Sequence, residues 1–465
     1  MKKLFVSTAI DYPSEKPHLG HCLEKVQADV FARHKRSQGF EVHFSNGLDE
    51  HGLKIQRRAE AVGKNPQDFV DEMYQHFNDL WLALNISNND FVRTSDNKHR
   101  KVVEKVFNLI YQKGDIYKGK YRGLYCVDCE TYYLPKDLDN GNCPIHQRPV
   151  EQIEEESYFF KMSKYQVQLI NYIRKNEYFI LPLSKRKEIL KRLEEPLQDL
   201  SISRKSVSWG LPLPNDSNLT LFVWVEALLN YFTTLNYPSE KFNKFWPADV
   251  HIIGKDIVWH HTVIWGSLLL SLGLQLPRTI FVHGFITING EKMSKSLGNV
   301  VEPLNLVRDY GSDAVRYYLL SEIPSTKDGD FSIEKFEGRY NDDLAKGLGN
   351  LVSRILKLSE GIQPKLSNKE LEEKIQKVKK EVFKALDNFK FNEALKTIWE
   401  LISFCDKYIE KEKPWEGGKD EVISNLLFAL LEIADLLKPF LPETSEKIIK
   451  QIKNREAEAL FPRLD

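Results

Sequence analysis

The chain has 465 residues, with 66 Lys and Arg against 66 Asp and Glu, and 42% of it is hydrophobic. At roughly 150 residues per domain, this length predicts about three domains that need no disulfides to fold. The zero net charge excludes a simple polybasic coat protein for nucleic acid, although a local basic surface stays compatible with it. No apolar run approaches the roughly 18 residues of a transmembrane helix, so we expect no membrane partner.

The first residues form a short apolar run, Leu4–Ile10, after Met1 and two lysines. This run resembles a signal peptide only weakly, because Ser7 and Thr8 interrupt it and no small-residue cleavage site follows. We interpret it as a buried first strand. The five cysteines are an odd, sparse set, which is typical of a reducing compartment, so we expect a cytoplasmic protein.

Strand and helix patterns alternate through the first 116 residues. Strand patterns cover Leu4–Ile10 and Val42–Asn46, and helical patterns cover Leu23–His34, Phe69–Leu84 and Arg100–Lys113. This alternation predicts an α/β domain with a parallel sheet.

The pattern changes between residues 117 and 214, where short β-like runs, Gly and Pro, and three of the five cysteines occur. Alternation then resumes with a strand at Leu219–Val223, a helix to Leu235, and strands at His251–Ile253 and Thr279–His283. We therefore predict an insertion, residues 117–214, that splits one α/β domain into halves at residues 1–116 and 215–340.

Residues 341–465 have a helical pattern throughout. Apolar residues step by four and three in two stripes: Leu344, Leu348, Leu351, Ile355 and Leu358, then Phe391, Leu395, Ile398, Ile402 and Cys405. Several such stripes predict a helical bundle whose apolar faces form a core.

The motif His18-Leu19-Gly20-His21 lies between a predicted strand and a predicted helix. Such a junction is at the carboxyl edge of a parallel sheet, where α/β folds bind ligands. Two imidazole donors at a helix N-terminus can hold nucleotide phosphates, and Gly20 leaves room for a purine. Taken alone, the motif is equally compatible with a chance pairing of histidines at a helix start.

A second motif, Lys292-Met293-Ser294-Lys295-Ser296, follows a strand and the turn Asn289-Gly290. Two lysines in a small, hydroxyl-rich loop can close on a polyphosphate as charge develops on the leaving group. The alternative is an ordinary solvated loop. The sequence has no GxGxxG motif, and the P-loop-like segment Gly114–Lys120 is followed by Tyr121 where Ser or Thr would hold Mg²⁺, so we interpret it as a turn.

The insertion carries the pattern Cys126-x2-Cys129-x13-Cys143-x2-His146. Two ligand pairs at this spacing predict one structural, tetrahedral Zn²⁺ per chain, bound by three cysteines and one histidine. A disulfide between two of these three cysteines would leave the third without a disulfide partner, so metal binding is the preferred interpretation. A site with four protein ligands has no open position for catalysis, so the metal should stabilise the insertion.

The histidine motif at residues 18–21 and the lysine motif at residues 292–296 resemble, respectively, the HIGH and KMSKS signatures of class I aminoacyl-tRNA synthetases. The resemblance is closest to the methionyl-tRNA synthetase family and extends over nearly the whole chain. It implies a Rossmann-like catalytic domain split by a zinc-knuckle insertion, followed by an all-α anticodon-binding bundle. It also implies that ATP with Mg²⁺ and L-methionine form an adenylate, from which methionine passes to the 3′ end of tRNA-Met.

The resemblance assigns roles to particular positions. His18, His21, Lys292 and Lys295 would be catalytic, and His18, Gly20, His21, Gly254, Asp256 and Lys295 would contact ATP. Asp49 of the segment Asp49-Glu50-His51-Gly52 would bind the methionine ammonium, and Ile10, Tyr12, Trp224, Leu228, Tyr231 and His261 would surround the thioether, for which aromatic groups suit a polarizable sulfur.

Three residues of the bundle would read the CAU anticodon, because splayed loop bases stack on aromatic side chains and bond at their edges. They are Asn350, Arg354 and Trp415, although Trp415 is also compatible with a hydrophobic plug after a helix. Asp11, Glu226 and Gly266 depart from the family's usual residues, and the role of each stays open. Because the chain stops soon after the bundle, we expect a monomer.

Three other readings fit less well. A cysteinyl-tRNA synthetase would carry a zinc-ligating cysteine before the first signature, where this chain has Thr8 to Tyr12. A catalytically silent tRNA-binding protein would not need both signatures intact. A nucleotidyltransferase acting on a small molecule would not need an anticodon-type bundle.

Overall fold

A computed structural model describes residues 2–128, 131–133, 135–145, 147–205, 207–288, 290–292 and 301–464. The chain divides into two compact units, each made of segments distant in sequence. Unit 1 comprises Met1–Pro17, Phe40–Asp79 and Asn88–Val282, and unit 2 comprises His18–Gly39, Leu80–Ser87 and His283–Asp465. None of the helices in the described part of the chain is both long and apolar enough to cross a membrane.

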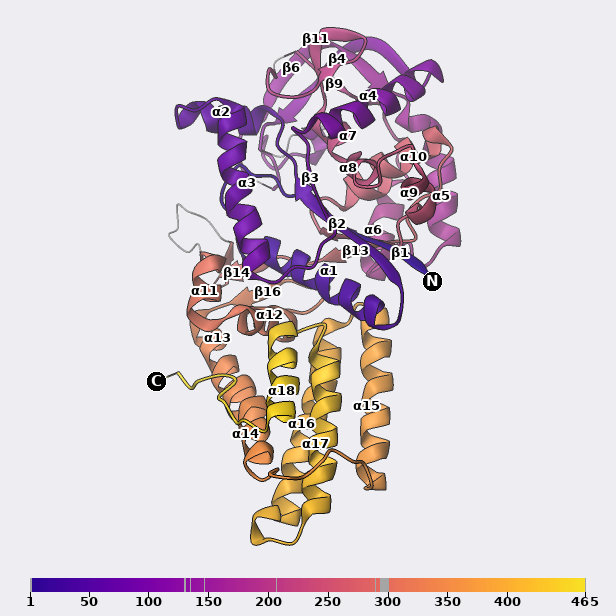
Figure 1. The fold of residues 1–465 in the computed structure, drawn as a ribbon. Helices are drawn as coiled ribbons and strands as arrows, with labels where there is room; N and C mark the ends of the chain where they lie inside the picture. Colours follow the sequence, from indigo (N-terminus) through magenta and orange to yellow (C-terminus); the bar gives the residue numbers. More distant parts are fainter. Residues whose placement is uncertain are drawn as a thin grey trace. The chain divides into compact units, whose positions relative to one another are not determined.

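Unit 1 is built on a six-stranded sheet with the order β3-β2-β1-β12-β13-β7 (Figure 1). Strand β1 pairs in parallel with both β2 and β12, and β2 with β3 and β13 with β7 are parallel too. The strands are β1 (Lys3–Thr8), β2 (Glu41–Leu48), β3 (Asp90–Arg93), β7 (Ile180–Leu181), β12 (Val250–Gly254) and β13 (Thr279–His283). The four inner strands β2, β1, β12 and β13 are almost wholly buried, as expected when a parallel sheet is covered on both faces, whereas the edge strands β3 and β7 are only partly buried. The predicted parallel sheet is therefore confirmed.

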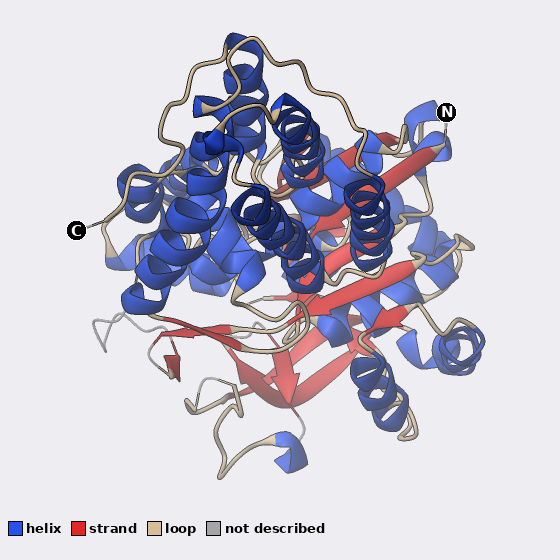
Figure 2. Cartoon of the chain, turned by 90° about the horizontal axis from the view of Figure 1, so that it is seen from below, coloured by secondary structure: helices blue, strands red, loops and turns tan. Residues whose placement is uncertain are grey.

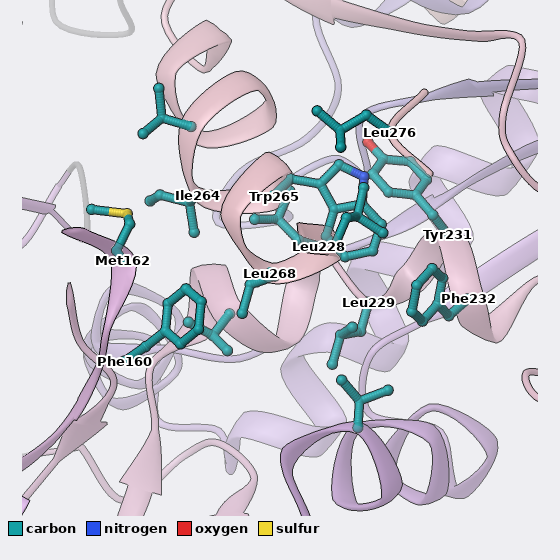
Figure 3. Packing of buried hydrophobic residues seen from close by; sticks show 14 of the residues in the cluster. Phe160, Met162, Leu228, Leu229, Tyr231, Phe232, Ile264, Trp265, Leu268 and Leu276 are labelled. Carbon is teal, nitrogen blue, oxygen red and sulfur yellow. The ribbon is translucent and has the colours of Figure 1, made fainter. Parts of the chain in front are cut away.

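Helices of unit 1 bury one large apolar cluster, part of which is drawn in Figure 3. The cluster includes Phe160, Met162, Leu228, Leu229, Tyr231, Phe232, Ile264, Trp265, Leu268 and Leu276. These helices are α4 (Asn97–Gln112), α5 (Gln166–Lys175), α6 (Leu183–Arg192), α7 (Val223–Ala227), α8 (Asn230–Thr233), α9 (Glu240–Phe245) and α10 (Trp265–Leu272). Helix α2 (Leu53–Ala61) and the first turns of α3 (Pro66–Ala83) enclose a separate, smaller apolar cluster. The predicted single helix to Leu235 is wrong: α7 and α8 are two short helices with Leu228 and Leu229 between them.

The insertion forms antiparallel sheets. One has the order β5-β4-β6-β8, with β4 (Ile116–Cys126), β5 (Thr131–Tyr133), β6 (Glu151–Phe160) and β8 (Leu200–Ser201). The other has the order β10-β11-β9, with β9 (Ser203–Arg204), β10 (Pro212–Leu213) and β11 (Asp216–Leu221). The predicted strand at Leu219–Val223 is thus present as β11, but it pairs antiparallel rather than rejoining the parallel sheet.

Two further details differ from or agree with expectation. The insertion contributes strand β7 to the edge of the parallel sheet. The sequence analysis did not predict this strand, because a strand of two residues is too short to show a periodic pattern. The P-loop-like segment Gly114–Lys120 is a turn only at its start, where Gly114 follows α4 with a φ of +76°. Its residues from Ile116 onward belong to β4, so the interpretation of the segment as a turn holds only for its first residues.

Unit 2 contains helix α1, a small sheet and a series of helices. The sheet has the order β15-β14-β16, with β14 (Ile286–Ile288), β15 (Glu291–Lys292) and β16 (Gly329–Phe331). The first helices are α1 (Leu19–Ser37), α11 (Pro303–Tyr310), α12 (Ser312–Ser321) and α13 (Ile333–Arg339). Helix α13 continues through a π-helical segment, η5 (Tyr340–Gly349), into α14 (Asn350–Lys357).

The last helices pack side by side as a bundle (Figures 1 and 2). They are α15 (Lys369–Asp387), α16 (Phe391–Glu412), α17 (Asp420–Leu437) and α18 (Pro442–Asn454). All five residues of the predicted stripe in α16 are buried, and only Leu358 of the earlier stripe is partly exposed. The predicted bundle is confirmed.

Candidate active site

The first signature motif caps a helix. Helix α1 begins at Leu19, so His18 is its N-cap residue, in an extended conformation with φ −128°. His18 Nδ1 accepts a hydrogen bond from the Gly20 backbone N–H at 3.1 Å, and His21 Nδ1 accepts one from the His18 backbone N–H at 3.1 Å. Each histidine thus satisfies one of the unpaired donors of the helix start, as Ser and Glu do in a capping box.

These two bonds determine where the imidazole protons lie. A ring nitrogen that accepts from a backbone N–H carries no proton, so in a neutral ring the proton is on Nε2. Burial, then the charges of His18, Lys25 and His283, lowers the pKa of His21 well below 6.5, so His21 is neutral at neutral pH. His21, and His18 when neutral, therefore each present an Nε2–H donor.

The two rings lie against each other, and the His18 ring also lies close to Gly20. Their centroids are 3.8 Å apart with an interplanar angle of 26°. A Cβ on Gly20 would lie 3.0 Å from His18 Cε1, which is tighter than ordinary van der Waals contact. A side chain at this position would therefore displace the His18 ring, which adds a local reason for glycine to the room it leaves for a purine.

A buried charge cluster follows the histidines on α1. Glu24 Oε1 lies 2.8 Å from Lys25 Nζ, and Glu24 Oε2 lies 3.1 Å from Nε2 of His283. Burial raises the pKa of Glu24, but Lys25 and His283 together outweigh it and hold that pKa below 4.5. The sequence reading missed this cluster, because neither motif includes Glu24, Lys25 or His283.

The second signature motif lies mostly outside the described residues. Lys292 is the last residue of β15, which pairs antiparallel with β14, and Gly290 has a positive φ of 79°, as expected in the predicted turn. Lys295 lies outside the described residues.

In unit 1, the predicted ammonium-binding residue Asp49 follows the carboxyl end of β2. Its backbone N–H donates to Asp11 O at 2.8 Å, and the Asp11 N–H donates to Gly47 O at 2.9 Å. A Cβ on Gly47 would lie 2.1 Å from Val92 O and 2.9 Å from Ile10 Cγ2. Because residue 47 is a glycine, β2 can approach β3 closely, and the Ile10 side chain can lie against β2 just before Asp49. Asp11 is buried, so its carboxylate is not a surface group.

The aromatic residues predicted to surround the thioether have definite partners. Tyr231 Oη lies 2.8 Å from His261 Nε2, and His261 Nδ1 lies 3.0 Å from Ile257 O. Since a carbonyl only accepts, His261 is protonated on Nδ1 and accepts from the Tyr231 hydroxyl. The opposite side of the Tyr231 ring stacks on His251 at 4.0 Å.

Trp224 has a partner that the sequence reading did not single out. Its indole stacks on His260, with centroids 3.9 Å apart and an interplanar angle of 21°. His260 begins the π-helical turn η3 (His260–Ile264), a geometry that often occurs at functional sites. Trp224 is only partly buried, whereas Leu228 and Tyr231 are almost fully buried in the core of Figure 3.

The remaining predicted residues of unit 1 lie at the end of β12 and in the insertion. Gly254 is the buried last residue of β12, and Asp256 is exposed in the turn after it. Cys126 and Cys143 are buried, whereas Cys129 and His146 lie outside the described residues. No group of three potential ligands occurs among the residues described, and these include only two of the four predicted ones, so the zinc site stays a prediction.

The predicted anticodon residues of unit 2 are near one another. Arg354 Nη2 on α14 lies 2.6 Å from Glu410 Oε1 on α16, and its guanidinium carbon is 5.8 Å from the centre of the Trp415 ring. Trp415 is in a short 3₁₀ helix, η6 (Pro414–Glu416), and is 47% exposed, so the reading as a buried plug is wrong. Asn350 is exposed at the start of α14.

The structure also shows the surroundings of Glu226 and Gly266, which, like the buried Asp11, depart from the family pattern. Glu226 is fully buried, and its Oε1 lies 2.5 Å from His51 Nδ1. A Cβ on Gly266 would lie 2.9 Å from Leu169 Cδ1, so a larger residue there would press on α5.

Two family models match the chain. The family described as "tRNA synthetases class I (M)" matches residues 4–149 and 133–356, and the "Anticodon-binding domain of tRNA ligase" matches residues 368–463. The methionine–tRNA ligase of Caldanaerobacter subterraneus is 42% identical, over 100% of this chain and 80% of that protein. The methionine–tRNA ligase of Clostridium perfringens is 45% identical, over 98% of this chain and 74% of that protein.

Solved structures agree with these matches. Mycobacterium tuberculosis methionyl-tRNA synthetase in complex with methionyl-adenylate superposes with a TM-score of 0.92 at 35% identity, covering 100% of this chain and 98% of that one. The apo form of the same enzyme gives a TM-score of 0.83 at 32% identity, covering 100% and 99%. Since a family model matches more than half of the chain and relatives at 42% and 45% identity span nearly all of it, the chain belongs to the methionyl-tRNA synthetases, a family of class I aminoacyl-tRNA synthetases.

Proposed function

We propose that His18, Gly20 and His21 hold ATP, and that Asp49 and the thioether-binding residues named above bind methionine, for adenylate formation. Membership of the family makes the chain an ATP-dependent methionine–tRNA ligase. The observation that carries the residue assignment is the pair of helix-capping imidazoles, whose Nδ1 atoms both accept backbone N–H groups. Their Nε2–H donors, at the positive end of α1, suit the oxygens of a polyphosphate.

The reaction needs orientation and charge stabilisation more than a general base. The methionine carboxylate attacks the α-phosphorus of ATP, an oxygen–phosphorus bond forms, and the bond to the β-phosphate breaks to release pyrophosphate. A neutral imidazole donor costs no proton transfer and strengthens its bonds as negative charge grows on the phosphate oxygens. Lys292 and Lys295 are proposed to neutralise the leaving pyrophosphate, and Mg²⁺ on the phosphates would add further charge neutralisation.

The second step moves methionine to tRNA. A ribose hydroxyl at the tRNA 3′ end attacks the carbonyl carbon of the adenylate, an ester bond forms, and AMP leaves with the shared oxygen.

The proposed nucleotide contacts of Gly254 and Asp256 are supported by their place at the carboxyl end of β12, where parallel sheets bind ligands.

For methionine, we propose that Asp49 pairs with the ammonium group. Its place at the carboxyl end of β2, beside Ile10, supports this role. The thioether would lie among Tyr12, Trp224, Leu228, Tyr231 and His261. The bond between the Tyr231 hydroxyl and His261 supports a dedicated role, because it gives the ring a fixed orientation in an otherwise apolar wall.

Outside the catalytic residues, we propose a structural Zn²⁺ held by Cys126, Cys129, Cys143 and His146. Support comes from the two buried thiols, Cys126 at the end of β4 and Cys143 in the segment between β5 and β6. A metal ion would crosslink these two segments of the insertion. A monomeric state and a cytoplasmic location stay predictions.

Asn350, Arg354 and Trp415 are proposed to read the CAU anticodon. An exposed indole with a guanidinium beside it is a suitable stacking surface for unpaired bases. Glu410, which pairs with Arg354, would have to yield that contact to a base or phosphate.

Exchange of pyrophosphate into ATP, measured separately with each standard amino acid, tests the proposal. Exchange that depends on methionine alone is expected. No exchange with any amino acid would favour a silent tRNA-binding protein, and exchange with cysteine would favour the cysteinyl reading.

A further inference from the structure

Two segments of the proposed methionine site are joined by one buried contact. His51 lies two residues after Asp49, and Glu226 lies two residues after Trp224. His51 Nδ1 is 2.5 Å from Glu226 Oε1, although the two residues are 175 positions apart in the sequence. His51 is 5% exposed and Glu226 is not exposed at all, so the contact is shielded from water.

On the His51 side, the segment Asp49–Gly52 is held along its backbone. The Glu50 N–H donates to Thr94 Oγ1 at 2.8 Å, and the Trp209 indole N–H donates to Glu50 O at 2.6 Å. The Gly52 N–H donates to Trp209 O at 3.0 Å. With its main chain pinned on both sides of His51, the segment has little freedom to adjust, so a displacement at His51 would be transmitted to Asp49.

On the other side, Glu226 is part of α7, a helix of only five residues that also carries Trp224. A single helical turn has almost no stability by itself, because nucleation is costly. No side chain caps α7 at Phe222, and Glu226 Oε2 has no hydrogen-bond partner among the residues described. Within the described part of the chain, the bond to His51 is therefore the polar contact of the Glu226 side chain, and it ties α7 to the Asp49 segment.

We propose that His51 and Glu226 form a positioning pair that sets the distance between Asp49 and Trp224, and thereby the affinity for methionine. This inference rests on the proposed methionine site and adds two residues to it. Neither needs to touch the substrate. The pair would act before the chemical step, so its loss should weaken methionine binding more than it slows the reaction of bound methionine.

The electrostatics of the pair support this role. Burial lowers the pKa of His51, but the charge and hydrogen bond of Glu226, with the charge of Glu50, outweigh burial and raise that pKa above 6.5. Burial and then the charge of His51 lower the pKa of His99, on α4, to about 3, so His99 stays neutral. Glu50 is itself paired with Arg93 at 2.8 Å. Glu226 thus favours the protonated form of His51, which is the form that binds Glu226 most strongly.

Methionine-dependent pyrophosphate exchange of Glu226→Gln, His51→Gln and the double variant tests the inference. Each single variant should raise KM for methionine by about tenfold or more, the usual effect of removing a positioning partner. KM for ATP should stay within about twofold, and kcat at saturating methionine within about threefold. The double variant should be no worse than the worse single one, because both remove the same contact.

Two further variants separate positioning from general destabilisation. Glu226→Asp keeps the charge and should restore much of the methionine affinity. Asp115→Asn is the matched control: Asp115 is a buried carboxylate of unit 1, paired with Lys164 and bonded to Ser271. It should lower the melting temperature and leave KM for methionine unchanged. All variants are checked by thermal unfolding, and His51→Gln serves if Glu226→Gln does not fold.

A pH profile gives an independent readout. In the unchanged protein, KM for methionine should rise as pH increases through the raised pKa of His51 and the imidazole loses its proton. In Glu226→Gln, that rise should move to lower pH, because the carboxylate no longer raises the pKa of His51. Titration of the methionine ammonium is common to both proteins and cancels in the comparison.

The inference is overturned if Glu226→Gln and His51→Gln leave KM for methionine unchanged, or raise the KM values of ATP and methionine equally. It is also overturned if Asp115→Asn raises KM for methionine as much as they do. If the unchanged protein shows no methionine-dependent exchange at all, the proposed function fails as well. These outcomes are therefore distinguishable.

Discussion

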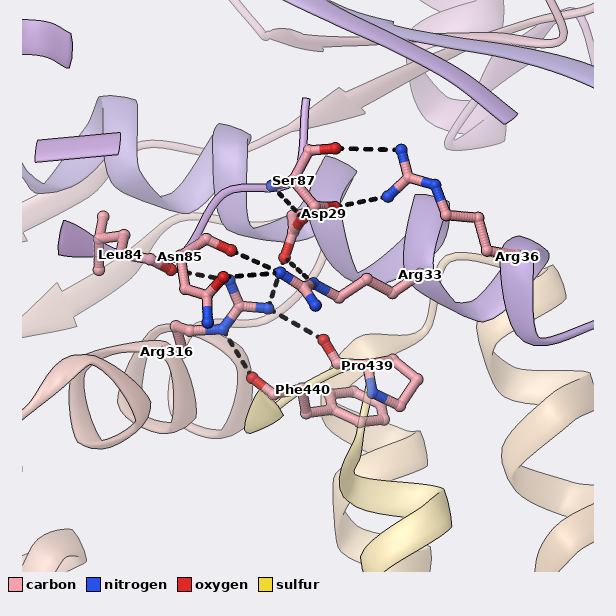
Figure 4. Close-up of polar contacts among 9 residues, drawn as sticks. All are labelled: Asp29, Arg33, Arg36, Leu84, Asn85, Ser87, Arg316, Pro439 and Phe440. Carbon is pink, nitrogen blue, oxygen red and sulfur yellow. Dashed lines mark hydrogen bonds and ion pairs between the residues drawn. The ribbon is translucent and has the colours of Figure 1, made fainter. Parts of the chain in front are cut away.

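Arg316 Nη2 on α12 lies 2.7 Å from Asp29 Oδ2 on α1, and neither side chain is exposed to solvent. The guanidinium also donates to the backbone oxygens of Phe440 at 2.7 Å, Pro439 at 2.9 Å and Leu84 at 3.1 Å (Figure 4). A buried charge is tolerated when it is paired and its donors are satisfied, as here. The pair therefore joins α1, which carries the signature histidines, to α12 and to the turn before α18.

Replacing Arg316 with Met should be strongly destabilising. The change leaves the Asp29 carboxylate buried without its nearest counter-charge, which typically costs about 3–5 kcal/mol. Urea unfolding measures the loss. The double variant Asp29→Leu/Arg316→Met should recover most of it, since it removes both buried charges. Arg33, which also pairs with Asp29, is partly exposed and keeps its hydrogen bonds to Asn85. A double variant as unstable as the single one would contradict this account.

The same carboxylate predicts a pH dependence. Burial raises the pKa of Asp29, but the charges of Arg316 and Arg33 and hydrogen bonds from Ser87 outweigh burial and lower that pKa below 3.8. Because the unfolded chain then binds this proton more readily, the stability from Asp29 is present above about pH 4 and is lost as pH falls through the folded pKa. The difference in unfolding free energy between the unchanged protein and Asp29→Asn should shrink on acidification, and a constant difference would contradict the assignment.

Replacing His18 or His21 with Ala should slow adenylate formation far more than it weakens methionine binding. Loss of one donor to a charged transition state typically costs about 10²–10³ in rate. Pyrophosphate exchange and the tryptophan fluorescence change on methionine binding measure the two effects. His76→Ala, on α3, is a control that should change neither. Unchanged adenylation in His18→Ala would remove the proposed role of the imidazole donors.

Trp415→Ala should impair aminoacylation of tRNA and leave methionine-dependent pyrophosphate exchange unchanged. Stacking of one base on an aromatic ring contributes about 1–3 kcal/mol, so charging at low tRNA concentration should fall by roughly ten- to a hundredfold. Ile449→Ala, at another exposed apolar position of the bundle, is the matched control. Equal loss of exchange and charging in Trp415→Ala would argue against anticodon contact.

Metal analysis of the purified protein should find one zinc per chain. Cys143→Ser removes a predicted ligand and should lower the zinc content and the thermal stability together, because metal binding and folding of such a module are linked. Cys405→Ala is the control, since Cys405 is a buried thiol of α16 outside the motif. An active, stable protein without zinc would refute the knuckle.

Much of the fold follows from local signals. Apolar periodicity located β1, β2, α3 and α4 to within a few residues, because each element presents one apolar face or run to the core with a period set by its own local geometry. The stripes of residues 344–355 and α16 were buried as expected. Strand β11 was located correctly but given the wrong neighbours, since periodicity says nothing about which strands pair. Strand β7 was missed because two residues carry no period.

The sequence by itself determined the family, the parallel sheet, the helical bundle and the positions of both signature motifs, because these depend on residues close together in the chain. Only the tertiary structure decided that His51 meets Glu226, that Asp29 meets Arg316, and that Trp224 stacks on His260. In each case the contact is made between segments far apart in the chain or between separate elements, and its strength depends on exclusion of water. Burial is a property of the packed chain, so no short pattern of residues encodes it.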